Sequence, residues 1–348
     1  MLVTQYYIGI DLHKRTSFLT VLDKEGNILA EKNMYNEKVR PWVKENVPYE
    51  SLGVIEATGN WSYLYDELEN IIQEVVLVHP KKVKAIASAA VKTDRIDAGV
   101  LATLARLNYL PRAYAAPKEL RNLRKVTRYR NLLVEVKTKL KNGVHAILMQ
   151  HNLHIPAADL FSPKGKGLLK KEMANLEATD QFILHHSLGQ IKELEERTRL
   201  AHEFGVGLLT EEQKELFRLL QTAPGIGPIH ALTILAEVGT IDRFPSDKAF
   251  TNWTGLVPRV RNSGGKQHHG HISKQGSRYI RAAFTRAASS ARLSSPALKK
   301  KYNQHLEHMS KVQATVALGR KLATIIYFMW KRHEPYDEDK VRVPLRKS

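Results

Sequence analysis

The first part of the chain alternates short apolar runs with stretches whose apolar residues recur at helical spacing. The runs YYIGID, SFLTVLD and NILAEKN predict three strands in a meander, with DKEGN as a turn. SLGVIEATG and VVLVHP predict two further buried strands. The helical patterns cover residues 37–47, 60–73, 81–90 and 93–108. This order predicts a mixed sheet covered by helices.

A different pattern begins near Pro117. ELRNLRKVTRYRNLLVEVKTKLKNGVHAILMQH has apolar residues every three or four positions and predicts one long amphipathic helix. FSPKGKG breaks the pattern, and a second long helix is expected over residues 168–203. Two such helices predict a hairpin arm or coiled coil, which often builds a dimer. A plain helical subdomain with a solvated basic face is the alternative.

The third part begins near Glu211, where LLQTAPGIGPIHALTILAEVG predicts a helix, a turn at PGIG and another helix. The remainder is helix-rich, with expected glycine loops at 263–266 and 270–277. The predicted fold class is therefore α/β plus all-α: a mixed sheet with flanking helices, a long-helix arm and a helical C-terminal domain. The expected domains are 1–115, 116–210, 211–335 and a basic tail at 336–348.

Composition narrows the class of partner. The 348 residues carry a net charge of +19, and no Asp or Glu occurs between Lys248 and Leu306. Such an excess favours a polyanion, with a basic membrane-surface protein as the rival interpretation. The hydrophobic content of 43% excludes a disordered protein, and the absence of cysteine excludes disulfides and thiolate zinc sites. No long apolar run or signal peptide is evident, so we expect a cytoplasmic protein without a membrane partner.

Four carboxylates form the first candidate site. Asp11 and Glu56 end two predicted strands, and KTDRIDAG places Asp94 and Asp97 on one side of a helix. Singly, each acid is more often a cap, a turn residue or part of a solvated ion-pairing face. Jointly, they form the pattern of ribonuclease-H-like nucleases. Converging carboxylates need a hard cation such as Mg²⁺, and two ions can clamp a phosphodiester.

The turn PGIG is the second candidate. Gly225 and Gly227, after Pro224, allow a tight turn, and the following helix start offers N–H groups to a phosphate. This arrangement is typical of helix-hairpin-helix binding of the nucleic-acid backbone. An ordinary turn between helices is the alternative.

The third candidate is RVRNSGGKQHHGHISKQG, which holds Ser263 among cations. A serine needs activation to act as a nucleophile, and taken alone Ser263 is more simply a loop residue. Neighbouring cations and glycines could hold a phosphate close to the backbone: Arg259, Arg261, Gly264, Gly265, Lys266, Lys274 and Arg278. His268, His269 and His271 lack carboxylate or thiolate partners in HHGH, so we interpret them as phosphate contacts or loop residues rather than a metal site.

Together these motifs resemble the transposases of the insertion-sequence family numbered one hundred and ten, the RuvC-like DEDD recombinases described as bridge-RNA-guided. YIGIDLHK, VIEATGNW and VKTDRIDAG resemble the three motifs of the family's catalytic domain. APGIGPIHALTILAEVG, FTNWTGLVPRVRNSGG, ISKQGSRYIRAAF and LGRKLATIIYFMW resemble its C-terminal transposase domain. The resemblance covers nearly the whole chain.

This resemblance implies a mechanism and partners. The four acids would bind Mg²⁺, with Mn²⁺ as a substitute, and Ser263 would attack a DNA phosphate to form a phosphoserine link. A structured non-coding RNA would pair with donor and target DNA. The acids and the serine lie on different domains, so a composite site in a dimer or tetramer is expected, acting at the nucleoid.

Two other functions stay open. The chain could be a RuvC-like nuclease or resolvase that uses metal-activated water, with Ser263 structural. It could also be a non-catalytic nucleic-acid-binding scaffold whose acids only form ion pairs.

Overall fold

A computed structural model describes residues 4–87, 93–263, 266–274 and 276–342. The chain divides into two compact units, Met1–Ala116 and Pro117–Ser348. The further division of the second part at residues 210 and 335 stays a prediction. Among the described residues, no helix combines the length and hydropathy that crossing a membrane requires.

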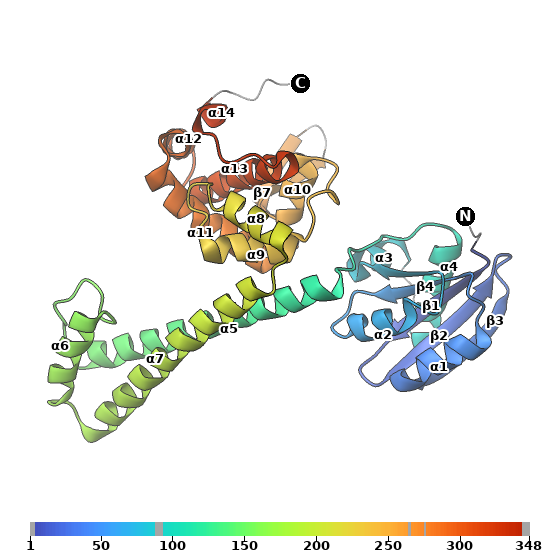
Figure 1. Cartoon of the computed structure of the whole chain (residues 1–348), viewed down its shortest axis with the longest axis horizontal. Coiled ribbons are helices and arrows are strands. Elements are labelled where there is room, and N and C mark those ends of the chain that lie inside the picture. Colours follow the sequence, from blue (N-terminus) through green and yellow to red (C-terminus); the bar gives the residue numbers. More distant parts are fainter. Residues whose placement is uncertain (1–3, 88–92, 264–265, 275, 343–348) are drawn as a thin grey trace. The chain divides into compact units, whose positions relative to one another are not determined.

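The first unit is built on a five-stranded sheet in the order β3-β2-β1-β4-β5 (Figure 1). Strands β1, β4 and β5 run parallel, and β2 runs antiparallel to both β1 and β3. This is the mixed sheet of ribonuclease-H-like proteins, as the sequence predicted. The strands are β1 Tyr6–Leu12, β2 Thr16–Asp23, β3 Ile28–Tyr35, β4 Ser51–Glu56 and β5 Glu74–Val78.

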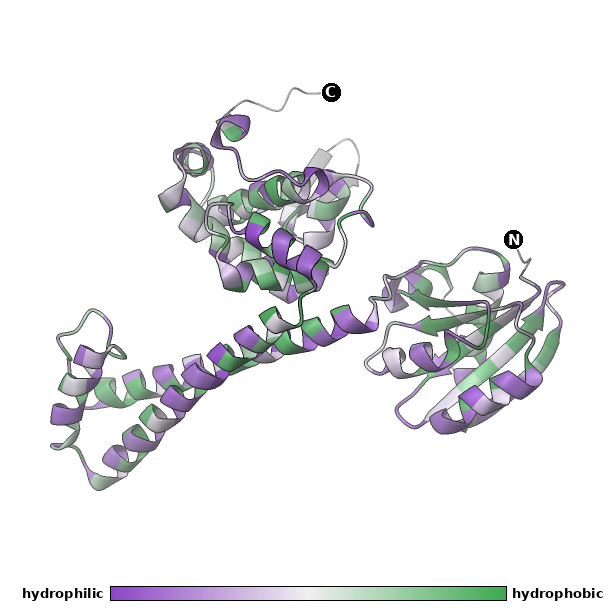
Figure 2. Ribbon diagram, viewed as in Figure 1, coloured by the Kyte–Doolittle hydropathy of each residue, from purple (hydrophilic) through white to green (hydrophobic). Residues whose placement is uncertain are grey.

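Helices cover both faces of this sheet because its central strands are apolar on both sides (Figure 2). One core joins Ile8, Ile10 and Ile55 to the first two helices. The other joins Val54 and Val76 to the last two. The helices are α1 Asn36–Asn46, α2 Trp61–Leu68, α3 Pro80–Ile86 and α4 Asp94–Arg106.

The second unit begins with an arm of two long helices, α5 (Lys118–Gln150) and α7 (Ala178–Gly207), which pack along each other (Figure 1). At its tip, α6 (Pro163–Met173) closes a small core around Leu148, Leu169 and Leu184. In Figure 2 both long helices alternate hydrophobic and hydrophilic residues, as expected for amphipathic helices that share a narrow seam.

The prediction that FSPKGKG only interrupts the helical pattern, with one helix over 168–203, is wrong. A helix already starts at Pro163, because the Ser162 hydroxyl accepts a hydrogen bond from the Gly165 N–H and proline suits a first helical turn. This helix ends at Met173, and the second long helix begins only at Ala178. Position 165 has no room for a side chain, since a Cβ there would lie 2.4 Å from the Asp159 carbonyl oxygen.

The rest of the second unit is a helical bundle around one core that includes Phe250, Phe284 and Leu318. As predicted, PGIG joins two helices, here α8 and α9. The helices are α8 Glu211–Leu220, α9 Pro228–Val238, α10 Asp247–Thr254, α11 Arg278–Ser294, α12 Pro296–Leu306, α13 Lys311–Arg332 and α14 Glu338–Arg342.

The expectation of a loop around Ser263 is also wrong. Strands β6 (Pro258–Ser263) and β7 (Lys266–Ile272) form an antiparallel hairpin. Pairing between the two strands, as between Arg261 and His268, holds these residues extended although the sequence lacks a regular apolar alternation. Gly264 and Gly265, the expected phosphate-approach glycines, lie outside the described residues.

Candidate active site

The first candidate site lies where α4 meets the end of β1. Asp11 is the penultimate residue of β1, and Asp94 is the first residue of α4. The Thr93 hydroxyl accepts a hydrogen bond from the Ile96 N–H, so it caps the helix start. Capping at this point fixes where Asp94 and Asp97 begin the helix.

The helix approaches the strand closely because position 9 is glycine. A Cβ on Gly9 would lie 1.9 Å from the Ala98 carbonyl oxygen and 2.5 Å from the Ala102 nitrogen. No side chain fits such a gap, so α4 rests directly on the β1 backbone. The first turn of α4 is thereby held beside the end of β1, where Asp11 lies.

Glu56 lies on the neighbouring strand at the same level. Strands β1 and β4 are parallel, and Ile10 is the register partner of Ile55. Asp11 and Glu56 are the next residues on the two strands, so the register carries both acids to the same edge of the sheet. Both are partly buried, as is Asp97 on α4.

The structure brings three side chains together: Asp11, His13 and Asp94. The Nε2 atom of His13 lies 3.2 Å from Oδ2 of Asp11 and 3.2 Å from Oδ1 of Asp94. One ligand atom from each of these residues falls within 4.8 Å of the others, a spacing that a single cation could occupy. Glu56 and Asp97 are not members of this group of three.

His13 occupies a defined position. Its backbone carbonyl accepts hydrogen bonds from the side-chain amides of Asn36 (3.1 Å) and Asn60 (2.8 Å). The pKa of His13 is raised: burial opposes the charged form, but hydrogen bonds and charge from Asp94 and Asp11 outweigh it. The two carboxylates therefore favour protonation of His13, which lies between them.

Sequence reasoning missed His13. It lies two residues after Asp11 in IGIDLHK, and strand alternation puts residues i and i+2 on one face. That spacing, next to a candidate metal-binding acid, was the available signal, because imidazole is a common metal ligand.

Ser263 belongs to the second unit. It is the last residue of β6, and its backbone lies opposite Lys266, the first residue of β7. In the same hairpin, Arg261 lies opposite His268. The side chains of residues 260–269, and with them the Ser263 hydroxyl, lie outside the described part of the structure.

The flanks of the hairpin are described. Arg259 is exposed and donates a hydrogen bond to the Ser273 carbonyl oxygen at 3.2 Å. Lys274 is exposed with a φ of 53°, a left-handed conformation. Ser277 caps α11, since its hydroxyl accepts a hydrogen bond from the Tyr279 N–H. The Ser277 hydroxyl therefore has a local structural partner.

The PGIG turn packs against α11. Gly225 has a φ of 77°, and a Cβ there would lie 2.2 Å from the Ala287 carbonyl oxygen. Gly227 is the residue before α9, and nothing lies within 4 Å of the Cβ it lacks. The two glycines therefore differ: the first is needed for packing, and the second leaves open space at a helix start.

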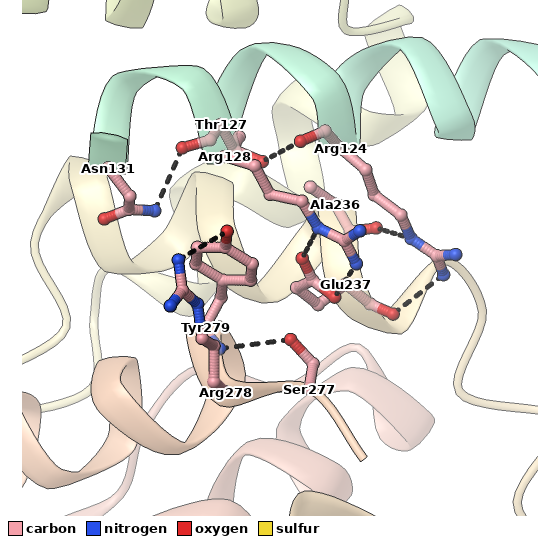
Figure 3. A network of polar contacts seen from close by, with 9 residues as sticks. All are labelled: Arg124, Thr127, Arg128, Asn131, Ala236, Glu237, Ser277, Arg278 and Tyr279. Carbon is pink, nitrogen blue, oxygen red and sulfur yellow. Dashed lines mark hydrogen bonds and ion pairs between the residues drawn. The ribbon is translucent and has the colours of Figure 1, made fainter. Parts of the chain in front are cut away.

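Arg278, expected to bind nucleic acid, begins α11 and lies beside a network that ties α5 to α9 (Figure 3). Its guanidinium donates to the Tyr279 hydroxyl at 3.2 Å. Across the network, Arg128 on α5 donates two hydrogen bonds to the carboxylate of Glu237, the penultimate residue of α9. A hollow of about 260 Å³ opens between α5, α9 and α11, with Arg278 in its lining.

A sheet of this topology with acids at the end of its central strand is typical of enzymes that act on nucleic-acid phosphodiesters, although the fold alone does not establish that activity. Two family models match the chain. One, described as a transposase and carrying DEDD and IS110 in its name, matches residues 8–153. The other, described as the IS116/IS110/IS902 transposase family, matches residues 217–303. The first range contains all four acids, and the second contains Ser263 and PGIG.

Curated proteins similar along most of their length carry matching names. A Pseudomonas aeruginosa protein named "Probable family 20 transposase" is 27% identical over 81% of this chain and 82% of its own length. The transposase of element IS1111A from Coxiella burnetii is 25% identical over 94% of this chain and 90% of its own length. A pilin gene-inverting protein of Moraxella lacunata is 25% identical over 97% and 99%. The chain belongs to the IS110 family of transposases, enzymes that cut and rejoin DNA.

Proposed function

We propose that this transposase recombines specific DNA sites through a phosphoserine intermediate at Ser263, with divalent metal held by its acid cluster. The observation that carries the proposal is the convergence of Asp11 and Asp94 around His13 at the end of β1. The similarity to pilin gene-inverting proteins supports a reaction that inverts DNA as well as one that moves an element.

The donor set fits a divalent metal. Two carboxylates and an imidazole lie within 4.8 Å of one another, and the strand register brings Glu56 to the same edge. Carboxylate oxygens suit Mg²⁺, and the imidazole makes Mn²⁺ an effective substitute. Asp11, Asp94 and Glu56 would hold the metal, with Asp97 one helical turn along from Asp94. A bound Mg²⁺ supplies charge stabilisation to a phosphodiester undergoing displacement.

Ser263 would supply the nucleophile. Its oxygen forms a bond to the scissile phosphorus while one phosphorus–oxygen bond to a deoxyribose breaks. The serine gives up its proton, and the departing deoxyribose oxygen takes one up, so the number of phosphoester bonds is unchanged. Attack by a deoxyribose hydroxyl on the phosphoserine then reverses this exchange and rejoins DNA without an external energy source.

Partners follow from charge and family resemblance. A net charge of +19 suits the backbones of donor DNA, target DNA and a structured guide RNA together. In this proposal the RNA selects sequence by base pairing, while the protein binds shape and backbone. The arm formed by α5 and α7 would join copies into a dimer or tetramer, and the complex would act on DNA at the nucleoid.

A trapping assay tests the mechanism. The protein, Mg²⁺, the element's junction DNA and the adjacent non-coding RNA are incubated together and resolved on a denaturing gel. Wild type should give a covalent protein–DNA adduct that Ser263→Ala and Asp11→Asn both lose. Ser273→Ala is the matched control, because it removes a nearby hydroxyl and should retain the adduct. Omitting the RNA should remove the adduct if the guide is required.

Other outcomes are equally informative. Cleaved DNA without an adduct, with Ser263→Ala still active, would make this a nuclease that uses metal-activated water. An adduct retained by Ser263→Ala but lost by Ser273→Ala would move the nucleophile. Full activity of Asp11→Asn would remove the acid cluster from the reaction.

A further inference from the structure

The hollow beside the PGIG turn lies within the second unit and is distinct from the acid cluster. Its volume is about 260 Å³, and helices α5, α9 and α11 line it. His230, Arg278 and Arg286 supply basic groups to its wall. The acid in the lining, Glu135, lies 3.5 Å from Arg278 and so has a cationic partner already.

Two arginines on α5, Arg128 and Arg130, differ in whether they have an acidic partner. Arg128 reaches Glu237 with two hydrogen bonds, as Figure 3 shows. Arg130, two residues later, is partly buried, and its Nε atom has no hydrogen-bond partner among the described residues. The pKa of Arg130 is lowered by burial and by the charge of Arg286. Arg130 therefore lies beside a like charge, where Arg128 has a carboxylate.

Two histidines share this environment. The pKa of His230 is lowered by burial and by the charges of Arg286 and Arg130, against a hydrogen bond to the Gly225 carbonyl oxygen. The pKa of His202 on α7 is lowered by burial and by Arg130, while Glu203 acts in the opposite sense. The Nδ1 atom of His202 is buried with no hydrogen-bond partner among the described residues.

Such a cluster is costly to fold. Burying a guanidinium beside another cation, with a donor unsatisfied, destabilises a protein unless an anion compensates it. Arginine clusters with spare donors are matched to phosphate groups, whose oxygens accept several hydrogen bonds at once. The volume exceeds that of one phosphate group, so a stretch of backbone could enter.

We propose that this hollow binds a phosphodiester of a nucleic-acid strand through Arg286 in its lining, together with Arg130, a partly buried neighbour of Arg286 outside that lining. The inference rests on the proposed function in that the protein acts on nucleic acid, but it does not depend on the phosphoserine chemistry. The strand could belong to DNA or to RNA, since both present the same phosphodiester.

Binding measured without catalysis tests the proposal. Fluorescence anisotropy would follow a labelled DNA duplex of mixed sequence, and separately a single-stranded RNA, across a series of KCl concentrations in EDTA. The double variant Arg130→Gln/Arg286→Gln should bind about tenfold more weakly, with a salt dependence shallower by about one to two phosphate contacts. If the double variant binds only the DNA duplex more weakly, the site is assigned to DNA. If it binds only the single-stranded RNA more weakly, the site is assigned to RNA.

The matched control is Arg197→Gln/Arg199→Gln on α7. It removes the same charge from arginines that already pair with Glu193, Glu196 and Glu203. It should change affinity by about twofold or less, through the long-range field alone.

A thermal melt checks folding, and Arg130→Gln alone should be at least as stable as wild type because it removes an uncompensated charge. Equal losses in the two double variants, or unchanged salt dependence for both probes, would overturn the proposal. EDTA blocks strand cleavage, so the binding measurement is independent of the trapping assay. If Ser263→Ala loses the adduct while the arginine variants bind as wild type does, the phosphate-binding hollow is rejected and the phosphoserine mechanism is not.

Discussion

Arg128 and Glu237 form a two-pronged ion pair, with distances of 2.8 Å and 3.0 Å between their paired nitrogen and oxygen atoms. The Glu237 side chain is 2% exposed and the Arg128 side chain 44% exposed. Beside them, Arg124 donates to the carbonyl oxygens of Ala236 and Glu237 at the end of α9, where a cation suits the helix dipole (Figure 3). This network fastens the arm helix α5 to α9.

Removing Arg128 should destabilise the protein more than neutralising Glu237. Arg128→Met leaves a buried carboxylate without its partner and should lower the free energy of unfolding by about 3 kcal/mol or more. Glu237→Gln should cost less, about 1–2 kcal/mol, because Arg128 can turn to water. Urea unfolding followed by circular dichroism measures both variants.

The control for that comparison is the exposed pair Arg197–Glu193, whose loss through Arg197→Met should cost about 0.5 kcal/mol or less. Equal costs for Arg128→Met and Glu237→Gln would show that burial of the carboxylate does not govern this pair.

Gly9 should be intolerant of any side chain. Gly9→Ala places a Cβ where the α4 backbone lies, so it should displace α4 and cost about 3 kcal/mol in stability. Because α4 begins with Asp94, the variant should also weaken any increase in melting temperature that Mg²⁺ produces through the proposed metal site. Gly99→Ala is the matched control: nothing lies within 4 Å of its added Cβ, so it should stabilise the helix by about 0.5–1 kcal/mol. A tolerated Gly9→Ala would contradict the close approach.

The two glycines of PGIG should separate folding from binding. Gly225→Ala should destabilise the second unit by about 2 kcal/mol or more, through its positive φ and the clash with Ala287. Gly227→Ala has space for its methyl group and an ordinary φ, so its melting temperature should match wild type.

If phosphate approaches the start of α9, Gly227→Ala should still weaken duplex binding several-fold. Anisotropy with the labelled duplex decides this point. Unchanged affinity would make PGIG an ordinary turn between helices.

The cationic surroundings of His230 predict a pH dependence. Its pKa is lowered by burial and by nearby arginines, so the unfolded chain takes up the proton first as pH falls below about 6.5. His230 therefore makes the folded protein less stable as pH drops through that window. His230→Gln should reduce the loss of melting temperature between about pH 7.5 and about pH 5.5.

His185→Gln, which removes an exposed histidine on α7, is the comparison variant measured over the same pH range. If the melting temperature of His230→Gln falls as much on acidification as that of wild type, His230 does not contribute to the pH dependence of stability.

Much of this protein is determined locally along its sequence. Strand and helix patterns predict the mixed sheet, the long-helix arm and the helical C-terminal region, because hydrophobic spacing and turn residues act over a few positions. The motifs around Asp11, Glu56, Asp94 and Ser263 indicated the transposase family, which the comparisons confirm. The catalytic and binding roles of these residues stay predictions.

Other features were decided only by tertiary structure. His13 joins Asp11 and Asp94 because Gly9 lets α4 rest on β1, a relation between residues about ninety positions apart. The hairpin at Ser263 depends on pairing between two strands, and neither strand alone has a strong apolar alternation. The uncompensated Arg130 could not be distinguished from the paired Arg128 by sequence, since the partner of each cation comes from whichever helix packs beside it.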